Sequence, residues 1–125
     1  MSDIDIKVLA DRLFEAMNHK DLVSVDRLCD NERLREACHR FLGAFPDVRI
    51  TPGWSIAEGD MIATWLELEG THEGPFRCIP ATGKEIRSAA IYALRRRGDH
   101  FIDYWLAADW LGVLDQIGAH RIETP

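Results

Sequence analysis

The hydrophobic pattern of this chain changes its period at Asp47, and this change limits the available folds more than any other feature. Before Asp47, apolar residues recur every three or four positions, which is typical of amphipathic helices. After it, apolar and polar residues alternate, which is typical of strands that bury one face. Helices followed by consecutive strands predict an α+β domain in which the helices cover one face of an antiparallel sheet.

The first third of the chain is expected to hold three helices. Asp21 is a candidate cap for the second helix, and Asp30 or Asn31 for the third. Gly43 and Pro46 are expected to end the third helix. The apolar stripes are Ile6, Leu9, Leu13 and Met17 in the first helix, Leu22, Val25 and Leu28 in the second, and Leu34, Ala37, Cys38, Phe41, Leu42 and Phe45 in the third.

Four strands are expected after the helices. The third and fourth should form a hairpin around Gly98 and Asp99, and Pro52 predicts that the first strand lies at an edge or contains a bulge. A short closing helix should begin at Trp110. The expected strands cover residues 48–56, 61–69, 85–97 and 100–109.

The fourth strand has two apolar faces. Simple alternation places Phe101, Trp105 and Asp109 on one face, with Tyr104 and Leu106 on the other. Three short helices can cover only one face of a sheet, and an exposed apolar face of this size is typical of an interaction surface. The sequence therefore predicts a homodimer formed through the sheet.

Composition limits the partners of the protein. No linker or repeat divides the 125 residues, so residues 1–125 are expected to form one domain. A net charge of −6 argues against nucleic acid, since phosphate binding needs a concentrated basic face. No apolar run approaches the roughly 20 residues that span a bilayer, so no membrane partner is expected. Cys29, Cys38 and Cys78 lack metal or disulfide spacing, which predicts reduced, mostly buried thiols, no metal site and a cytoplasmic location.

Six short segments between residues 45 and 118 resemble a known family, the SnoaL-like polyketide cyclases or ester cyclases of the nuclear transport factor 2-like superfamily. The resemblance implies a cystatin-like, cone-shaped fold, in which a curved antiparallel sheet of four to five strands wraps around the N-terminal helices and encloses a pocket. It also implies dimerisation through the sheet. The segments are FPDVRI (45–50), IAEGD (56–60), GTHEGPF (70–76), IPATGK (79–84), WLAAD (105–109) and LGVLDQIG (111–118).

The resemblance also implies a reaction, the intramolecular aldol closure of a polyketide ring without a cofactor. By motif position Asp109, four residues after Trp105 and three before Gly112, would be the general acid/base. Its apolar neighbours would raise the pKa of this carboxyl toward the working pH. The small-molecule substrate would bind in the pocket of the fold.

Other interpretations stay open. Asp109 is also well placed to cap the helix that begins at Trp110. Family members pair the aspartate with a histidine on the preceding strand, and residues 92–95 contain none. The same fold also hosts non-catalytic ligand-binding or dimerisation modules, isomerases and epoxide hydrolases, so the fold alone does not decide between them.

Further candidates have both a functional and a structural interpretation. The tryptophans either line an apolar pocket or fill the core, and the tyrosines either stabilise an oxyanion, as in ketosteroid isomerase, or pack. His72 either takes part in catalysis or anchors its loop. Asp103 could pair with Asp109 and Arg87 in an arrangement similar to that of the epoxide hydrolases. Besides the catalytic Asp109, the expected substrate-binding residues are Trp105, Trp65, Trp54, Tyr92, Tyr104, His72 and Asp103.

Overall fold

The structure is a computed structural model that describes residues 4–118. Four helices and one four-stranded antiparallel sheet, with strand order β1-β2-β3-β4, confirm the α+β class. The helices precede the strands, except for one short helix that closes the chain. The elements are α1 (Ile6–Asn18), α2 (Leu22–Leu28), α3 (Glu32–Ala44), β1 (Arg49–Glu58), β2 (Met61–Thr71), β3 (Glu85–Arg97), β4 (His100–Ala108) and α4 (Trp110–Gln116).

Side-chain caps set where the helices begin. Asp21 caps α2, and Asn31, not Asp30, caps α3, where its side-chain oxygen accepts a hydrogen bond from the Leu34 amide at 3.0 Å. The Asn31 side chain also donates to the Ile102 carbonyl in β4 at 2.9 Å, so one residue starts a helix and fixes it to the sheet. Gly43 lies inside α3 and does not end it.

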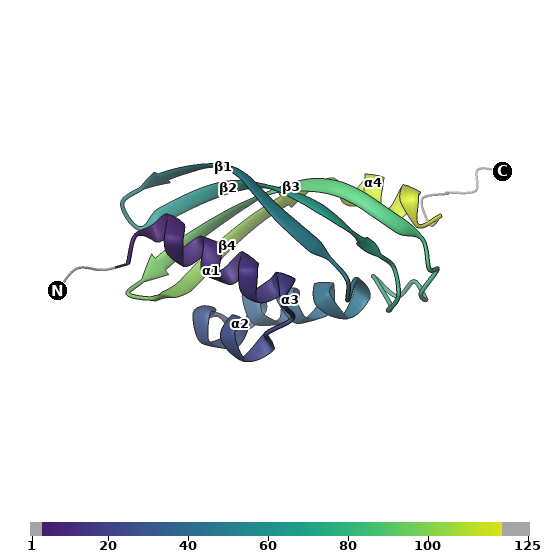
Figure 1. Ribbon diagram of the computed structural model, residues 1–125, viewed down its shortest axis with the longest axis horizontal. Helices are drawn as coiled ribbons and strands as arrows, with labels where there is room; N and C mark the ends of the chain where they lie inside the picture. Colours follow the sequence, from purple (N-terminus) through teal and green to yellow (C-terminus); the bar gives the residue numbers. More distant parts are fainter. Residues whose placement is uncertain (1–3, 119–125) are drawn as a thin grey trace.

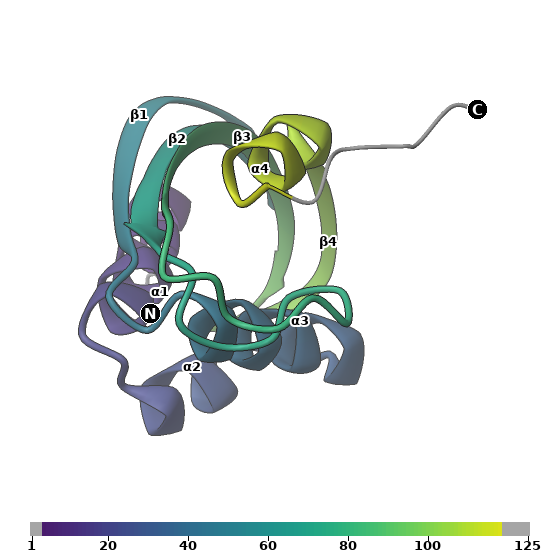
Figure 2. The ribbon, with the colours of Figure 1, turned by 90° about the vertical axis from the view of Figure 1, so that its right-hand side faces the viewer.

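The sheet curves over the first three helices (Figure 1). Viewed from the end that carries α4, the strands form an open arc, and α3 lies across the opening between β1 and β4 (Figure 2). Asn18, at the end of α1, holds this arrangement by two hydrogen bonds to the backbone of Ile50 in β1, at 2.8 and 2.6 Å. The concave face therefore points toward the helices, and the convex face points away from them.

A bulge in β1 changes which side chains reach the core. The register with β2 shifts between Pro52 and Ser55, which confirms the expected bulge on an edge strand. Ile50 is buried, whereas Trp54 and Ile56 are exposed on the convex face. Simple alternation along residues 48–56 would place Ile50, Trp54 and Ile56 on one face, but the extra residue in the bulge reverses the alternation beyond it.

A second bulge, where β3 pairs with β4, has the same effect on Phe101. The pairs Arg95–Asp103 and Arg96–Phe101 leave one extra residue in β4. Phe101 is 0% exposed, whereas Trp105 is 50% exposed. Simple alternation had placed both on one face, and the bulge separates them.

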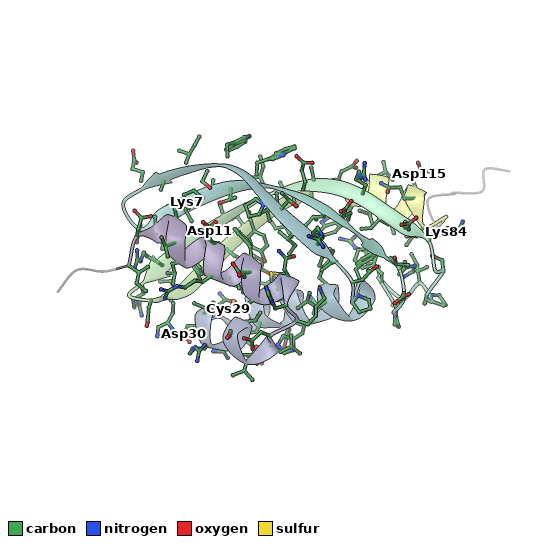
Figure 3. The ribbon with its side chains drawn as sticks, viewed as in Figure 1. Lys7, Asp11, Cys29, Asp30, Lys84 and Asp115 are labelled. Carbon is green, nitrogen blue, oxygen red and sulfur yellow. The ribbon has the colours of Figure 1, made fainter. Side chains whose placement is uncertain are left out.

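The core fills the space between the helices and the concave face. Cys29 and Cys38 are buried and free, and Cys78 is free and exposed. Cys29 and Asp30 lie beyond the end of α2, at the opposite end of the molecule from Lys84 and Asp115 (Figure 3). No helix within residues 4–118 is long and apolar enough to cross a membrane. The largest fully buried side chains are Phe14, Phe45, Phe101, Leu9, Leu13, Leu34, Ile62, Leu94 and Ile117, together with His72.

Candidate active site

A cavity of about 780 Å³ lies between the concave face of the sheet and α3. Its size is within the usual range for small-molecule sites. All four strands, α1, α3, the first residue of α4 and the loop between β2 and β3 contribute to its walls. The lining residues are Met17, Asn31, Arg33, Ala37, Arg40, Phe41, Ile50, Leu66, Leu68, Pro75, Phe76, Arg77, Ala90, Tyr92, Asp103, Tyr104, Trp105, Leu106 and Trp110.

Three aromatic rings form one wall of the cavity. The Trp110 ring lies 5.8 Å from that of Phe76 and 6.3 Å from that of Phe41, measured between ring centroids. Buried Phe45 packs behind them, 5.1 Å from Phe41 and 5.3 Å from Phe76. We call Phe41, Phe76 and Trp110 the aromatic wall. Such a surface suits a flat, conjugated ligand, because aromatic rings stack favourably at these separations.

Two tyrosines stand in the cavity opposite α3. The rings of Tyr92 in β3 and Tyr104 in β4 are 6.1 Å apart. Burial, followed by the influence of Cys38, raises the pKa of Tyr92 well above its ordinary value, so this phenol stays protonated at neutral pH. Tyr104 is only partly buried, and its position on the cavity lining leaves its ring within reach of a ligand.

Asp103 is the one carboxylate among the described residues that line the cavity. Its nearest cation is Arg95, with 3.5 Å between Nη1 and Oδ2. The Arg95 guanidinium also lies 5.6 Å from the centre of the Trp105 ring. The expected partner, Arg87, instead pairs with Glu69 at 3.3 Å. The epoxide-hydrolase-like grouping of Asp103, Arg87 and Asp109 is therefore not formed.

Asp109 lies outside the cavity. It is exposed, and its Oδ1 accepts a hydrogen bond from the Gly112 amide at 2.8 Å, which makes it the N-cap of α4. A Cβ at position 112 would be 2.2 Å from Oδ2, so glycine is needed for this close approach. Asp109 borders a shallow hollow on the sheet, which also includes Trp65 and Ala89. Its role as general acid/base stays a prediction.

The structure divides the predicted site residues into two groups. Tyr92 and Tyr104 stand in the cavity, Asp103 and Trp105 border it from the edge strand β4, and the other predicted residues do not line it. Trp54 and Trp65 stack on each other on the convex face, with 6.3 Å between their rings. His72 is 0% exposed and bonded through Nδ1 to the Thr82 hydroxyl at 2.9 Å, so it joins the two ends of the loop between β2 and β3.

Most lining residues were not predicted as part of the site, among them the aromatic and charged residues Phe41, Phe76, Trp110, Arg33, Arg40 and Arg77. The helical spacing of residues in α3 could have indicated some of them from the sequence. Arg33, Ala37 and Phe41 follow one another at intervals of four, and Arg40 lies three after Ala37 and seven after Arg33, so all four fall on one side of the helix. Arg77 carries no such signal, because its position depends on how the loop between β2 and β3 folds back against α4. Among residues 4–118, no group of three His, Cys, Asp or Glu side chains could hold a metal ion.

Comparison with known proteins identifies the fold and the family. No curated protein sequence matches this chain. Solved structures with the same fold include TsrD from Streptomyces laurentii, with a TM-score of 0.81 and 23% identity over 94% of this chain and 99% of that one. AclR from Streptomyces galilaeus has a TM-score of 0.78 and 22% identity, over 90% and 94% of the two chains.

A third structure carries the name of a family that the sequence resembles. A SnoaL-like polyketide cyclase from Agrobacterium tumefaciens has a TM-score of 0.74 and 13% identity over 94% of this chain and 100% of that one. Identities this low support a shared fold only. The family model of the SnoaL-like polyketide cyclases, however, matches residues 1–117. The chain therefore belongs to the SnoaL-like polyketide cyclase family.

Proposed function

We propose that this protein closes a ring in a small apolar carbonyl substrate by acid/base catalysis, without a cofactor, in the cavity beneath the sheet. The observation that carries the proposal is a cavity of about 780 Å³, lined mostly by apolar and aromatic side chains, with one carboxylate, Asp103, among its described lining residues. Membership of the SnoaL-like family supports the reaction class. A substrate with two carbonyl groups flanking one carbon stabilises its own carbanion as an enolate.

In this mechanism the Asp103 carboxylate removes a proton from the carbon between two carbonyl groups. The Tyr104 phenol donates a hydrogen bond to the carbonyl oxygen that becomes the enolate oxygen. The carbanion attacks a second carbonyl of the same molecule, which forms the ring C–C bond and leaves an alkoxide. The alkoxide takes the proton back from Asp103, so the carboxylate is regenerated and no proton is lost.

Filling the cavity tests its role. Ala90 in β3 lines the cavity, whereas its neighbour Ala89, which pairs with Glu67, does not; both border the hollow beside Asp109. We expect Ala90→Leu to lower the kcat/KM for ring closure of a linear aryl tetraketone by about 10-fold or more, because the added methyl groups occupy substrate space. Turnover is followed by chromatography, as the loss of the linear tetraketone and the appearance of its cyclic aldol isomer.

Ala89→Leu is the matched control, since it adds the same atoms to the other face of the same strand. It should leave kcat/KM within about two-fold of wild type. Loss of turnover in Ala89→Leu but not in Ala90→Leu would move the site to the face of Asp109. If neither wild type nor variants turn over the tetraketone, but wild type binds it and Ala90→Leu does not, the protein is a ligand-binding module.

We also propose that the convex face joins two copies of the chain. Trp54, Ile56, Trp65, Ile91 and Trp105 form a convex apolar patch that the helices do not cover, and Trp54, Ile56 and Trp105 are at least half exposed. A two-fold interface places such a patch against itself. Two ion pairs within one chain, Arg95–Asp103 and Arg87–Glu69, lie at the rim of this patch.

Charge placed in the convex apolar patch should separate the two copies. We expect wild type to show twice the mass of one chain in light scattering, and Ile56→Glu with Trp105→Glu to show the mass of one chain, because two buried carboxylates would face each other across the two-fold axis. Val23→Glu, on the exposed side of α2, is the control and should stay dimeric. A wild-type mass of one chain at every concentration would contradict the proposal.

A further inference from the structure

The cavity lining is positively charged in a protein that is acidic overall. Arg33, Arg40 and Arg77 line it together with a single carboxylate, Asp103, whereas the whole chain has a net charge of −6. Within residues 4–118, Arg33 and Arg77 form no ion pair, and Arg40 reaches only exposed Glu36 in its own helix, at 3.9 Å. Arginines without partners at a cavity leave their donors available to a bound anion.

Arg77 is held against the aromatic wall by a tight turn. Phe76 and Ile79 exchange two backbone hydrogen bonds, of 3.0 and 2.9 Å, so Arg77 and Cys78 are the two central residues of a hairpin turn. Both have positive φ, 49° and 66°, a conformation in which glycine or asparagine is usual. The turn places the Arg77 guanidinium 5.2 Å from the centre of the Trp110 ring and 5.6 Å from that of Phe76.

This geometry brings a cation and a stacking surface to one part of the cavity. Arg40, from α3, lines the same cavity as Arg77 and Trp110. A guanidinium above an aromatic ring keeps its planar N–H groups free at its edge, where they match a carboxylate. The positive φ at Arg77 is the one that a two-residue hairpin turn requires, and this turn fixes the direction in which the side chain leaves the loop.

We propose that the natural ligand of the cavity carries an anionic group, a carboxylate on a conjugated or aromatic acyl skeleton, and that Arg77 together with Arg40 binds this group. The skeleton lies along the aromatic wall, and the carboxylate points to the cavity mouth. The inference rests on the proposed function, because it takes the same cavity as the substrate site and adds the chemical class of the ligand. It predicts that the substrate is a free acid rather than an ester or amide.

Two probes of equal shape and different charge test the inference. Naphthalene-2-carboxylate and its methyl ester are titrated into the full chain at neutral pH and low salt, with binding measured by calorimetry. We expect wild type to bind the acid about 10-fold more tightly than the ester, because only the acid accepts charged hydrogen bonds from arginine. Arg77→Gln should weaken binding of the acid about 10-fold and change that of the ester less than about two-fold.

Two further variants separate charge from folding. Arg77→Gly removes the side chain and relieves the positive φ, so it should melt at or above the wild-type temperature and still lose the preference for the acid. Arg97→Gln removes one exposed arginine outside the cavity lining and should keep the preference. If wild type binds the acid and the ester equally, this inference is wrong. If Ala90→Leu then weakens the binding of both, the cavity is still the binding site. A wild type that binds neither probe would overturn the inference as well.

Discussion

The Asp103→Asn variant should turn over a linear aryl tetraketone at least about 100-fold more slowly than wild type, with little change in KM. The amide has nearly the shape of the carboxylate but cannot take a proton from carbon. The loss should therefore fall on kcat. The measurement is the initial rate of ring formation over a range of substrate concentrations.

Asp109→Asn is the matched control for this prediction. Asparagine caps helices as well as aspartate does, so α4 should keep its start, and kcat should stay within about two-fold of wild type. The two variants distinguish the two candidate bases directly. If Asp109→Asn abolishes turnover and Asp103→Asn does not, the assignment suggested by the family motif is correct and the base proposed here is wrong.

Phe101→Ala should lower the free energy of unfolding by about 3–5 kcal/mol. Phe101 is 0% exposed, and the bulge between β3 and β4 directs it into the core. Its carbonyl also accepts a hydrogen bond from the Asp30 amide at 2.8 Å, which fixes the segment before α3 to β4. Loss of the ring would leave a cavity, and the backbone held by this hydrogen bond could not readily move to fill it. Urea denaturation, followed by circular dichroism, measures the change.

Leu111→Ala is the control for the stability measurement, because Leu111 in α4 is 71% exposed. Its truncation should change the free energy of unfolding by less than about 0.5 kcal/mol. A cost below about 1 kcal/mol for Phe101→Ala would mean that simple alternation is correct and that Phe101 lies on the convex face beside Trp105.

The sequence predicted the elements well because their causes are local. The apolar stripe of α1 and the caps at Asp21 and Asn31 act within one or two helical turns, so the helices and their approximate starts could be predicted from the sequence, although Gly43 did not end α3. The hairpin turn at Gly98 could also be predicted from the sequence. Gly98 has a φ of 61°, and glycine adopts this conformation without strain. These signals led to the correct α+β class.

The candidate site was only partly predictable. Tyr92 and Tyr104 were expected at the pocket and line it. Trp54 and Trp65 were expected there too, but they stack on the convex face. The aromatic wall combines side chains from α3, a loop and α4, and nothing in the local pattern of any one segment indicates the other two.

The change of period at Asp47 thus determined by itself which segments are helices and which are strands, and in what order. Only the tertiary structure decided which face each strand side chain occupies. The physical reason is that a β-bulge adds one residue without changing the hydrophobic pattern, and that one residue reverses every side chain beyond it. For the same reason Phe101 lies in the core while Trp105, four positions later, lies half exposed at the edge of the sheet.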